Sequence, residues 1–276
     1  MPRTGNSRGR PYNAWASNHN KGGKEQGFLR GTAKGAGAMK REEVRARIEE
    51  LGIIPAVRAS CAEDASFAAE AVASGGLPIV EITMTVPGAL EVISYLVKHY
   101  PKVLVGAGTI LDNDTAHRCL DAGAQFLTDP CLDMKLIELA KNHDVVVLSG
   151  ALTPTEVYTA WKAGSDFVKV FPCSQMGGES YIRALKGPFP KIPLVAAGGV
   201  NQETATKFIL AGAVALGIGN ELIPRDAVVK RRAEQIHELA KRFQRLVKAG
   251  RQRIAAGKEA KGSNKSNTPE QGPVNG

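Results

Sequence analysis

Short apolar runs alternate with longer stretches of helical periodicity along most of this sequence, and this alternation constrains the fold more than any other feature. The runs are rich in Val and Ile without steady polar alternation, which is typical of parallel strands buried on both faces. Eight runs are predicted as strands: 53–58, 78–83, 103–106, 125–127, 145–148, 167–171, 194–197 and 214–217. Eight strand-then-helix units predict an α/β fold, a (β/α)₈ TIM barrel, although the recurring glycines before four strands fit a doubly wound sheet nearly as well.

Helical periodicity fills the intervals between the predicted strands. The helices are predicted at 62–74, 89–99, 115–122, 134–142, 155–163 and 202–210. An extra N-terminal amphipathic helix opens at Met39 and ends before Gly52. A last helix with one apolar stripe is predicted over 227–249, with Asp226 as its N-cap. The predicted barrel domain therefore spans 39–250.

The net charge of +9 is concentrated at the two ends of the chain. Segment 1–38 carries +6 and segment 251–276 carries +3, so the middle is neutral. Both ends are rich in Gly, Asn, Ser and Lys and lack hydrophobic periodicity, which predicts disordered basic tails. A non-enzymatic protein that binds nucleic acid through these tails is one alternative, but the neutral middle and the lack of regularly interleaved aromatics disfavour it. Segment 1–38 has two open interpretations: either translation truly starts at Met39, or the segment is a genuine basic tail.

Composition and motifs exclude several other classes. The cysteines form no CxxC pair, which argues against a zinc knuckle or a disulfide framework; they are Cys61, Cys119, Cys131 and Cys173. No apolar run approaches the roughly 18 residues of a membrane span, and the N-terminus lacks the apolar core of a secretory signal. No histidine falls at the end of a predicted strand, which disfavours a metal site and a metal-dependent aldol mechanism. A cytoplasmic protein without a membrane partner is expected.

Two ionisable residues fall where a barrel carries its chemistry, at the C-terminal side of its strands. Lys169 stands in an apolar run, D-F-V-K-V-F-P at 166–172, where an edge strand would turn it to solvent. Inside a barrel, desolvation favours the neutral amine, which is a nucleophile. Glu81 ends the second strand, where an inward carboxylate could shuttle protons or form a salt bridge.

Other strand ends carry groups suited to binding an anionic substrate. Arg58 follows the first strand and could clamp a carboxylate, or could be a surface charge. Thr109 follows Gly-Ala-Gly and could donate to a carboxylate, cap a helix, or both. The turns Gly198-Gly199 and Gly219-Asn220 follow the seventh and eighth strands, the usual phosphate position of this fold, where backbone N–H groups bind an anion.

Several motifs together resemble one known family, the 2-keto-3-deoxy-6-phosphogluconate (KDPG) and 4-hydroxy-2-oxoglutarate (KHG) aldolases. The matching motifs are E-I-T at 81–83, V-G-A-G-T at 105–109, V-K-V-F-P at 168–172 and K-G-P-F-P at 186–190. The resemblance covers about 39–247. It implies a class I aldolase, a homotrimeric barrel that needs no cofactor. It also implies that Lys169 forms the Schiff base and that Glu81 is the general acid and base.

The resemblance also implies a substrate and its surroundings. Thr109, Pro130 and Phe171 would surround the pyruvyl group, and the two glycine turns would hold the phosphate. The implied reaction cleaves a phosphorylated 2-keto-3-deoxy acid such as KDPG to pyruvate and glyceraldehyde 3-phosphate. The 4-hydroxy-2-oxoglutarate and 2-dehydro-3-deoxy-6-phosphogalactonate aldolase activities are alternatives.

The chain departs from the family pattern at three positions. Thr85 stands where many members have an Arg, and Arg58 resembles the arginine that other members carry after the first strand. Ala197 replaces a common Thr that is expected to touch the substrate near the cleaved carbon, which leaves the sugar acid undetermined. Asn220 replaces a common Ser and can still bind a phosphate. A phosphate-binding isomerase or epimerase, with Glu81 and Lys169 as a non-covalent acid/base pair, is the rival enzyme.

Overall fold

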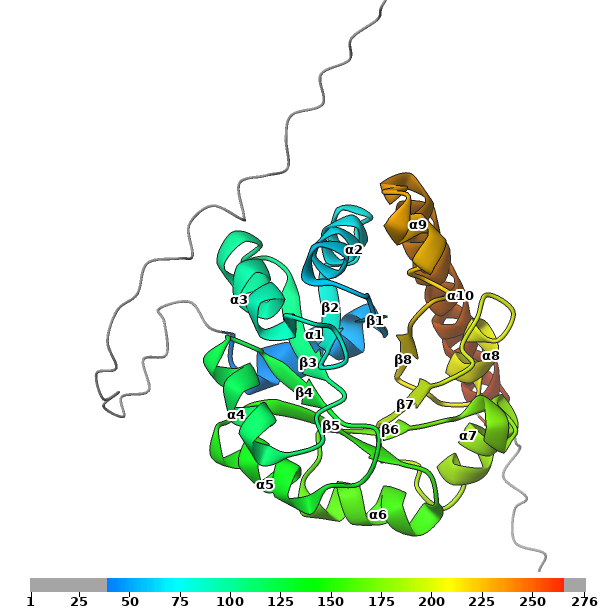
Figure 1. Cartoon of the computed structure of the whole chain (residues 1–276). Helices are drawn as coiled ribbons and strands as arrows, with labels where there is room; N and C mark the ends of the chain where they lie inside the picture. The colour runs from blue at the N-terminus through cyan, green and yellow to red at the C-terminus, as the bar shows by residue number, and fades with distance from the viewer. Residues whose placement is uncertain (1–38, 266–276) are drawn as a thin grey trace, which may run out of the picture. The chain divides into compact units, whose positions relative to one another are not determined.

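The computed structural model describes residues 39–265 as one closed barrel of eight parallel strands, surrounded by helices (Figure 1). Each strand is hydrogen-bonded to its neighbours in sequence, and β8 closes the sheet onto β1. This topology confirms the predicted (β/α)₈ barrel. The predicted tail at 1–38 and the last part of the predicted C-terminal tail, 266–276, lie outside the described residues.

All eight predicted strands are present, with ends shifted by at most a few residues. They are β1 (Ile53–Val57), β2 (Ile79–Thr83), β3 (Leu104–Gly108), β4 (Phe126–Thr128), β5 (Val146–Ala151), β6 (Phe167–Val170), β7 (Leu194–Ala197) and β8 (Ala215–Ile218). Every strand residue is buried except Lys169 and Gly217, which are half-buried. Burial on both faces explains why the sequence shows continuous apolar runs instead of alternation.

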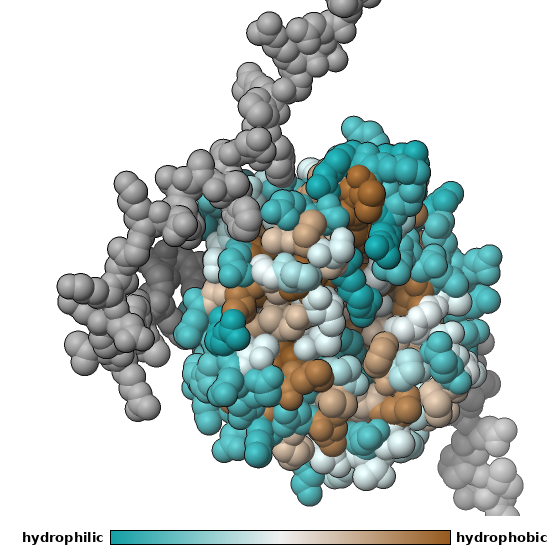
Figure 2. Space-filling model, in the orientation of Figure 1, coloured by the Kyte–Doolittle hydropathy of each residue, from teal (hydrophilic) through white to brown (hydrophobic). Residues whose placement is uncertain are grey.

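The helices lie outside the barrel. They are α1 (Arg41–Leu51), α2 (Ala62–Ser74), α3 (Ala89–His99), α4 (Asn113–Asp121), α5 (Met134–Asn142), α6 (Pro154–Ala163), α7 (Glu179–Lys186), α8 (Ala205–Leu210), α9 (Arg225–Val229) and α10 (Ala233–Lys265), with a 3₁₀ turn η1 (Ser174–Met176). In Figure 2, hydrophilic residues dominate the rim, while apolar residues gather nearer the middle. No helix within 39–265 is long and apolar enough to cross a membrane.

Side-chain caps explain where several helices begin. The Asp112 carboxylate accepts a hydrogen bond from the Thr115 N–H (2.7 Å), so α4 starts before the predicted residue 115. Thr153 and Glu156 form a capping box at the start of α6. Asn201 Oδ1 accepts from the N–H of Thr204, which holds the chain in a turn and delays α8 beyond its predicted start.

The predicted single helix over 227–249 is wrong, because the chain forms two helices there. Arg231 has φ 54°, a left-handed conformation that separates α9 from α10. Asp226 lies within the first turn of α9 and is not its N-cap, since that position is Pro224. Helix α7, between β6 and β7, was not predicted because it is short and buries only Ile182 and Leu185.

The predicted end of the fold at residue 250 is also wrong. Helix α10 continues through Gly250 to Lys265 and runs beside α8 and α2 (Figure 1). Gly250 packs closely on Ile209, since a β-carbon on this glycine would lie 2.9 Å from Ile209 Cγ2. Arg251 donates to the backbone carbonyls of Glu49 and Glu50. The composition of 251–265 resembles a tail, but these long-range contacts fix its beginning to the barrel.

Candidate active site

A cavity of about 260 Å³ opens at the C-terminal ends of the strands. It contains eight of the ten site residues predicted from the sequence: Arg58, Glu81, Lys169, Phe171, Gly198, Gly199, Gly219 and Asn220. Thr109 and Pro130, the other two, do not line it. The closed barrel brings these residues together because parallel strands end at the same rim.

Lys169 reaches this cavity from the middle of β6. Its side chain is 12% exposed, and its Nζ donates a hydrogen bond to Thr128 Oγ1 at 3.2 Å. The distance from Nζ to Glu81 Oε2 is 3.9 Å, an ion-pair contact that is too long for a direct hydrogen bond. The interpretation of Lys169 as a solvent-facing residue of an edge strand is therefore wrong, because a closed barrel has no edge.

Glu81 is buried with one oxygen paired and one unpaired. Its side chain is 5% exposed, and Oε2 accepts a hydrogen bond from Thr128 Oγ1 at 3.1 Å. Among the described residues, Oε1 has no hydrogen-bond partner. A buried carboxylate oxygen without a partner is costly. Such a group can bind or deprotonate a ligand that supplies the missing donor.

Two buried polar residues at the end of β4, Thr128 and Asp129, were not assigned any role from the sequence. Asp129 accepts hydrogen bonds from the Gly150 N–H (2.5 Å) and from Ser149 Oγ (3.4 Å). Burial raises the pKa of Asp129 to about 7, against the opposing effects of the Gly150 N–H, the Lys169 charge and the Ser149 hydroxyl. The sequence places Thr128 and Asp129 at the end of a predicted strand, which could have marked them as site candidates. It does not reveal which groups they contact.

Thr109 and Pro130 lie at neighbouring strand ends. Thr109 has φ 59°, and α4 is capped by Asp112, so the helix-cap interpretation of Thr109 is wrong. Pro130 packs on Gly150 of β5, since a β-carbon there would lie 2.3 Å from the Pro130 carbonyl carbon. A role for either residue beside a pyruvyl group stays a prediction.

The two glycine turns have the geometry of close-approach loops. Gly198 (φ 83°) and Gly199 (φ 80°) adopt left-handed conformations that favour glycine. Arg58 is exposed and lies against Gly219, where a β-carbon would come within 2.6 Å of its Nη1. The structure therefore places the guanidinium beside the turn that was predicted to hold a phosphate.

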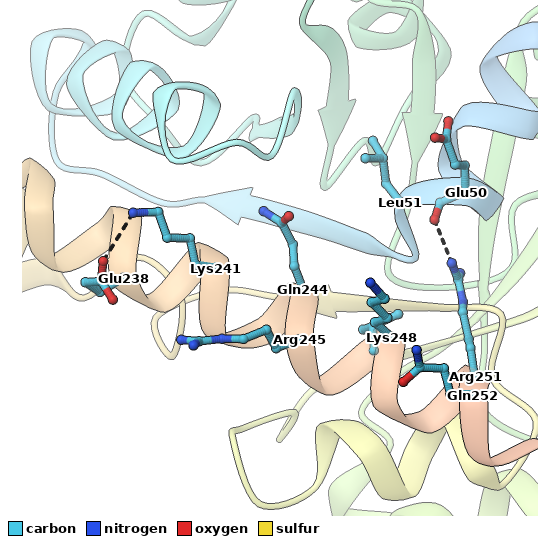
Figure 3. Close-up of a pocket in the computed structure, with 10 residues that line it drawn as sticks. Glu50, Leu51, Glu238, Lys241, Gln244, Arg245, Lys248, Arg251 and Gln252 are labelled. Carbon is cyan, nitrogen blue, oxygen red and sulfur yellow. Dashed lines mark hydrogen bonds and ion pairs between the residues drawn. The ribbon is translucent and has the colours of Figure 1, made fainter.

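A larger depression, of about 800 Å³, lies between α1 and α10 (Figure 3). Its polar groups come from helices and from no strand end. Its ion pair, between Lys241 and Glu238 (3.3 Å), is mostly exposed to solvent. The buried amine and carboxylate are found only in the smaller cavity of the two, which we identify as the candidate active site. Within 39–265, no cluster of His, Cys, Asp or Glu is arranged to hold a metal ion.

A (β/α)₈ barrel with a lysine amine beside a buried carboxylate at its mouth has the architecture of an enzyme acting on carbonyl compounds. The aldolase family model described as "KDPG and KHG aldolase" matches residues 44–239. The chain belongs to this family and is an aldolase, a carbon–carbon lyase.

Individual relatives agree with this assignment. A 2-dehydro-3-deoxy-6-phosphogalactonate aldolase of Escherichia coli is 32% identical over 200 residues, which cover 72% of this chain and 97% of that protein. A 2-dehydro-3-deoxy-phosphogluconate aldolase of Pseudomonas aeruginosa is 30% identical over 204 residues, covering 72% and 93%. A solved KDPG aldolase from Legionella pneumophila, holding pyruvate as a covalent carbinolamine, has a TM-score of 0.67 at 26% identity, covering 71% of this chain and 96% of that one.

Proposed function

We propose that this protein is a class I aldolase that cleaves a phosphorylated 2-keto-3-deoxy sugar acid, with KDPG as the first candidate, through a Schiff base on Lys169. The observation that carries the proposal is the position of Lys169 Nζ, which faces the cavity 3.9 Å from the buried carboxylate of Glu81. A lysine in such a site can attack a carbonyl, and a nearby carboxylate can move the protons that the reaction requires.

The proposed mechanism begins with attack of the neutral Lys169 amine on the C2 ketone. The resulting carbinolamine loses water and becomes an iminium, which is an electron sink. Glu81, acting through a water molecule, removes the C4 hydroxyl proton, and the C3–C4 bond breaks to give an aldehyde and an enamine. Protonation and hydrolysis of the enamine then release pyruvate and free the lysine. Because the lysine itself provides the electron sink, this mechanism uses no cofactor.

The substrate phosphate is assigned to the turns at Gly198-Gly199 and Gly219-Asn220. The left-handed glycines of the first turn let backbone N–H groups approach an anion closely, and Arg58 adds a positive charge beside the second turn. The similar E. coli protein is named for a phosphogalactonate substrate, so 2-dehydro-3-deoxy-6-phosphogalactonate is a second candidate. KHG, which has no phosphate, is a third. We also propose that the enzyme is a cytoplasmic homotrimer, and this part of the proposal rests on family resemblance alone.

Borohydride reduction in the presence of pyruvate, followed by peptide mass spectrometry, tests the assignment. We expect an adduct on Lys169 in the wild type and in Glu81→Gln, and none in Lys169→Arg, because a guanidinium cannot be deprotonated at useful pH. Lys186 is the matched control, since its Nζ binds the carbonyls of Pro190 and Ile192 away from the cavity. An adduct on Lys186 would contradict the proposal. A wild type without any adduct would favour the isomerase or epimerase.

A further inference from the structure

The hydroxyl of Thr128 occupies the gap between the two ionisable groups of the active site. Its Oγ1 lies 3.2 Å from Lys169 Nζ and 3.1 Å from Glu81 Oε2, whereas those two atoms are 3.9 Å apart. The side chain is fully buried. The hydroxyl therefore provides a hydrogen-bonded path between an amine and a carboxylate that do not hydrogen-bond directly.

The direction of both hydrogen bonds is fixed by the chemistry of the partners. An ammonium group can only donate hydrogen bonds, and a carboxylate can only accept them. The Thr128 hydroxyl must therefore accept from Lys169 and donate to Glu81. This is the arrangement in which one proton can enter a hydroxyl while another leaves it.

The backbone around Thr128 holds the hydroxyl in this position. The Thr128 carbonyl accepts a hydrogen bond from the Ile110 N–H at 3.2 Å on the β3 side. On the β5 side, Thr128 is in register with Leu148, and the carboxylate of the following residue, Asp129, binds the Gly150 N–H. Contacts on both sides of β4 fix the strand end, so Thr128 is pre-organised rather than mobile.

We propose that the Thr128 hydroxyl is a catalytic proton relay between Lys169 and Glu81, an inference that rests on the proposed Schiff-base function. In the forward step, an N–H bond of the Lys169 ammonium breaks and its proton passes to Thr128 Oγ1. The original Thr128 proton passes at the same time to Glu81 Oε2. The products are a neutral amine, an unchanged threonine and a neutral glutamic acid, so one proton has moved and the charges balance.

The relay has a use in both halves of Schiff-base formation. The amine must lose a proton before it attacks the ketone. Glu81, now protonated, can return that proton to the carbinolamine hydroxyl, which leaves as water when the iminium forms. Oε2, the oxygen that receives the proton, lies 3.9 Å from Lys169 Nζ and is therefore the oxygen that returns it to the carbinolamine formed on that amine.

The test compares Thr128→Val, which keeps the shape and removes the hydroxyl, with Thr128→Ser, which keeps the hydroxyl. The measured quantity is the rate at which pyruvate forms a borohydride-trappable adduct on Lys169, followed by rapid quenching. We expect this rate to fall about 100-fold in Thr128→Val, the lower range of a lost proton-transfer group, and to stay within about threefold in Thr128→Ser. The final extent of adduct should be the same in all three proteins.

A second measurement on the wild type separates a relay from a merely structural role. Adduct formation is followed in mixtures of H₂O and D₂O. Two protons in flight give a curved dependence of the rate on deuterium fraction, whereas a threonine that only positions the lysine gives a linear one. A linear dependence, or a wild-type rate in Thr128→Val, would overturn the relay. If Thr128→Val fails to fold, the isotope measurement decides alone. A wild type that forms no adduct on Lys169 would instead contradict the proposed function.

Discussion

Gly108 faces the carboxylate of Glu81 so closely that a β-carbon on this glycine would lie 2.0 Å from Glu81 Oε1. The two residues belong to neighbouring strands, β3 and β2, which are paired in register from Ile79↔Leu104 to Thr83↔Gly108. The missing side chain at 108 is therefore a condition for burying Glu81 beside Lys169.

Gly108→Ala should displace the Glu81 carboxylate and lower kcat about 100-fold, the lower range for a lost general base, while adduct formation with pyruvate persists. Gly106→Ala is a matched control on the same strand, because its β-carbon would meet the Phe126 ring instead. The control should lose about 1–3 kcal/mol of stability by overpacking and keep its turnover. Steady-state kinetics and urea unfolding measure both effects. Full activity in Gly108→Ala would show that the position of Glu81 does not depend on a glycine at 108.

The Arg58 guanidinium lies beside the Gly219 turn, so we expect it to bind the phosphate end of the substrate. Arg58→Gln should raise KM for KDPG about tenfold, the loss of one charge-assisted hydrogen bond. The rate of adduct formation with pyruvate should change by less than about threefold. Pyruvate has no phosphate, so it does not make the contact that Arg58→Gln removes. Comparable losses with both compounds would instead support the carboxylate clamp predicted from the sequence.

Much of the fold could be predicted because its strands have a strong local signal. Because both of their faces are buried, β1 and β7 are unbroken apolar runs in the sequence. In a closed parallel barrel, the C-terminal ends of all strands lie at the same rim. Eight of the ten predicted site residues line one cavity for this reason. What could not be predicted depends on pairs of residues far apart in sequence. Thr128 is separated from Lys169 by 41 positions and from Glu81 by 47. No local sequence pattern around Thr128 indicates that its hydroxyl bridges Lys169 and Glu81.

Ala197 lines the cavity at the end of β7, in register with Gly217 of β8. Because Ala197 offers no hydroxyl, we expect weak discrimination between the C4 epimers KDPG and 2-dehydro-3-deoxy-6-phosphogalactonate. Ala197→Thr should increase the ratio of their kcat/KM values at least about tenfold. Ala197→Val, with the same shape and no hydroxyl, should leave the ratio nearly unchanged. If the wild type already discriminates strongly and neither substitution alters the ratio, another residue sets C4 specificity.

Asp129 makes the stability of the fold depend on pH. Its pKa is raised from the ordinary 3.8 to about 7, chiefly by burial, so the folded state holds a proton that the unfolded state releases. Stability from this group is therefore complete below pH 3.8 and falls as pH rises toward about 7. In Asp129→Asn, the loss of unfolding free energy between pH 5 and pH 8 should be smaller than in the wild type by roughly 2–4 kcal/mol. Urea unfolding at both pH values measures this, and equal losses would show that Asp129 titrates normally.

Arg251 joins the start of the predicted C-terminal tail to the N-terminal helix. Its Nη1 donates to the Glu50 carbonyl at 2.6 Å, and its Nη2 donates to the carbonyls of Glu49 and Val214, the latter at 3.1 Å. Figure 3 shows the contact with Glu50. The carbonyls of Glu49 and Glu50 belong to the last turn of α1, where a helix carries partial negative charge. The guanidinium therefore satisfies the end of α1 and ties it to the middle of α10.

A chain that ends at Gly250 should lose stability for this reason, although composition alone suggests that the fold is complete there. We expect the free energy of unfolding to fall by about 2 kcal/mol, typical of lost hydrogen bonds to a charged group, and the melting temperature by about 4–8 °C. Arg251→Gln should reproduce most of the loss in the full chain. Arg253→Gln is the control, since Arg253 is exposed and should change stability by less than about 0.5 kcal/mol. A Gly250-terminated chain that melts like the full protein would mean that these hydrogen bonds contribute no net stability.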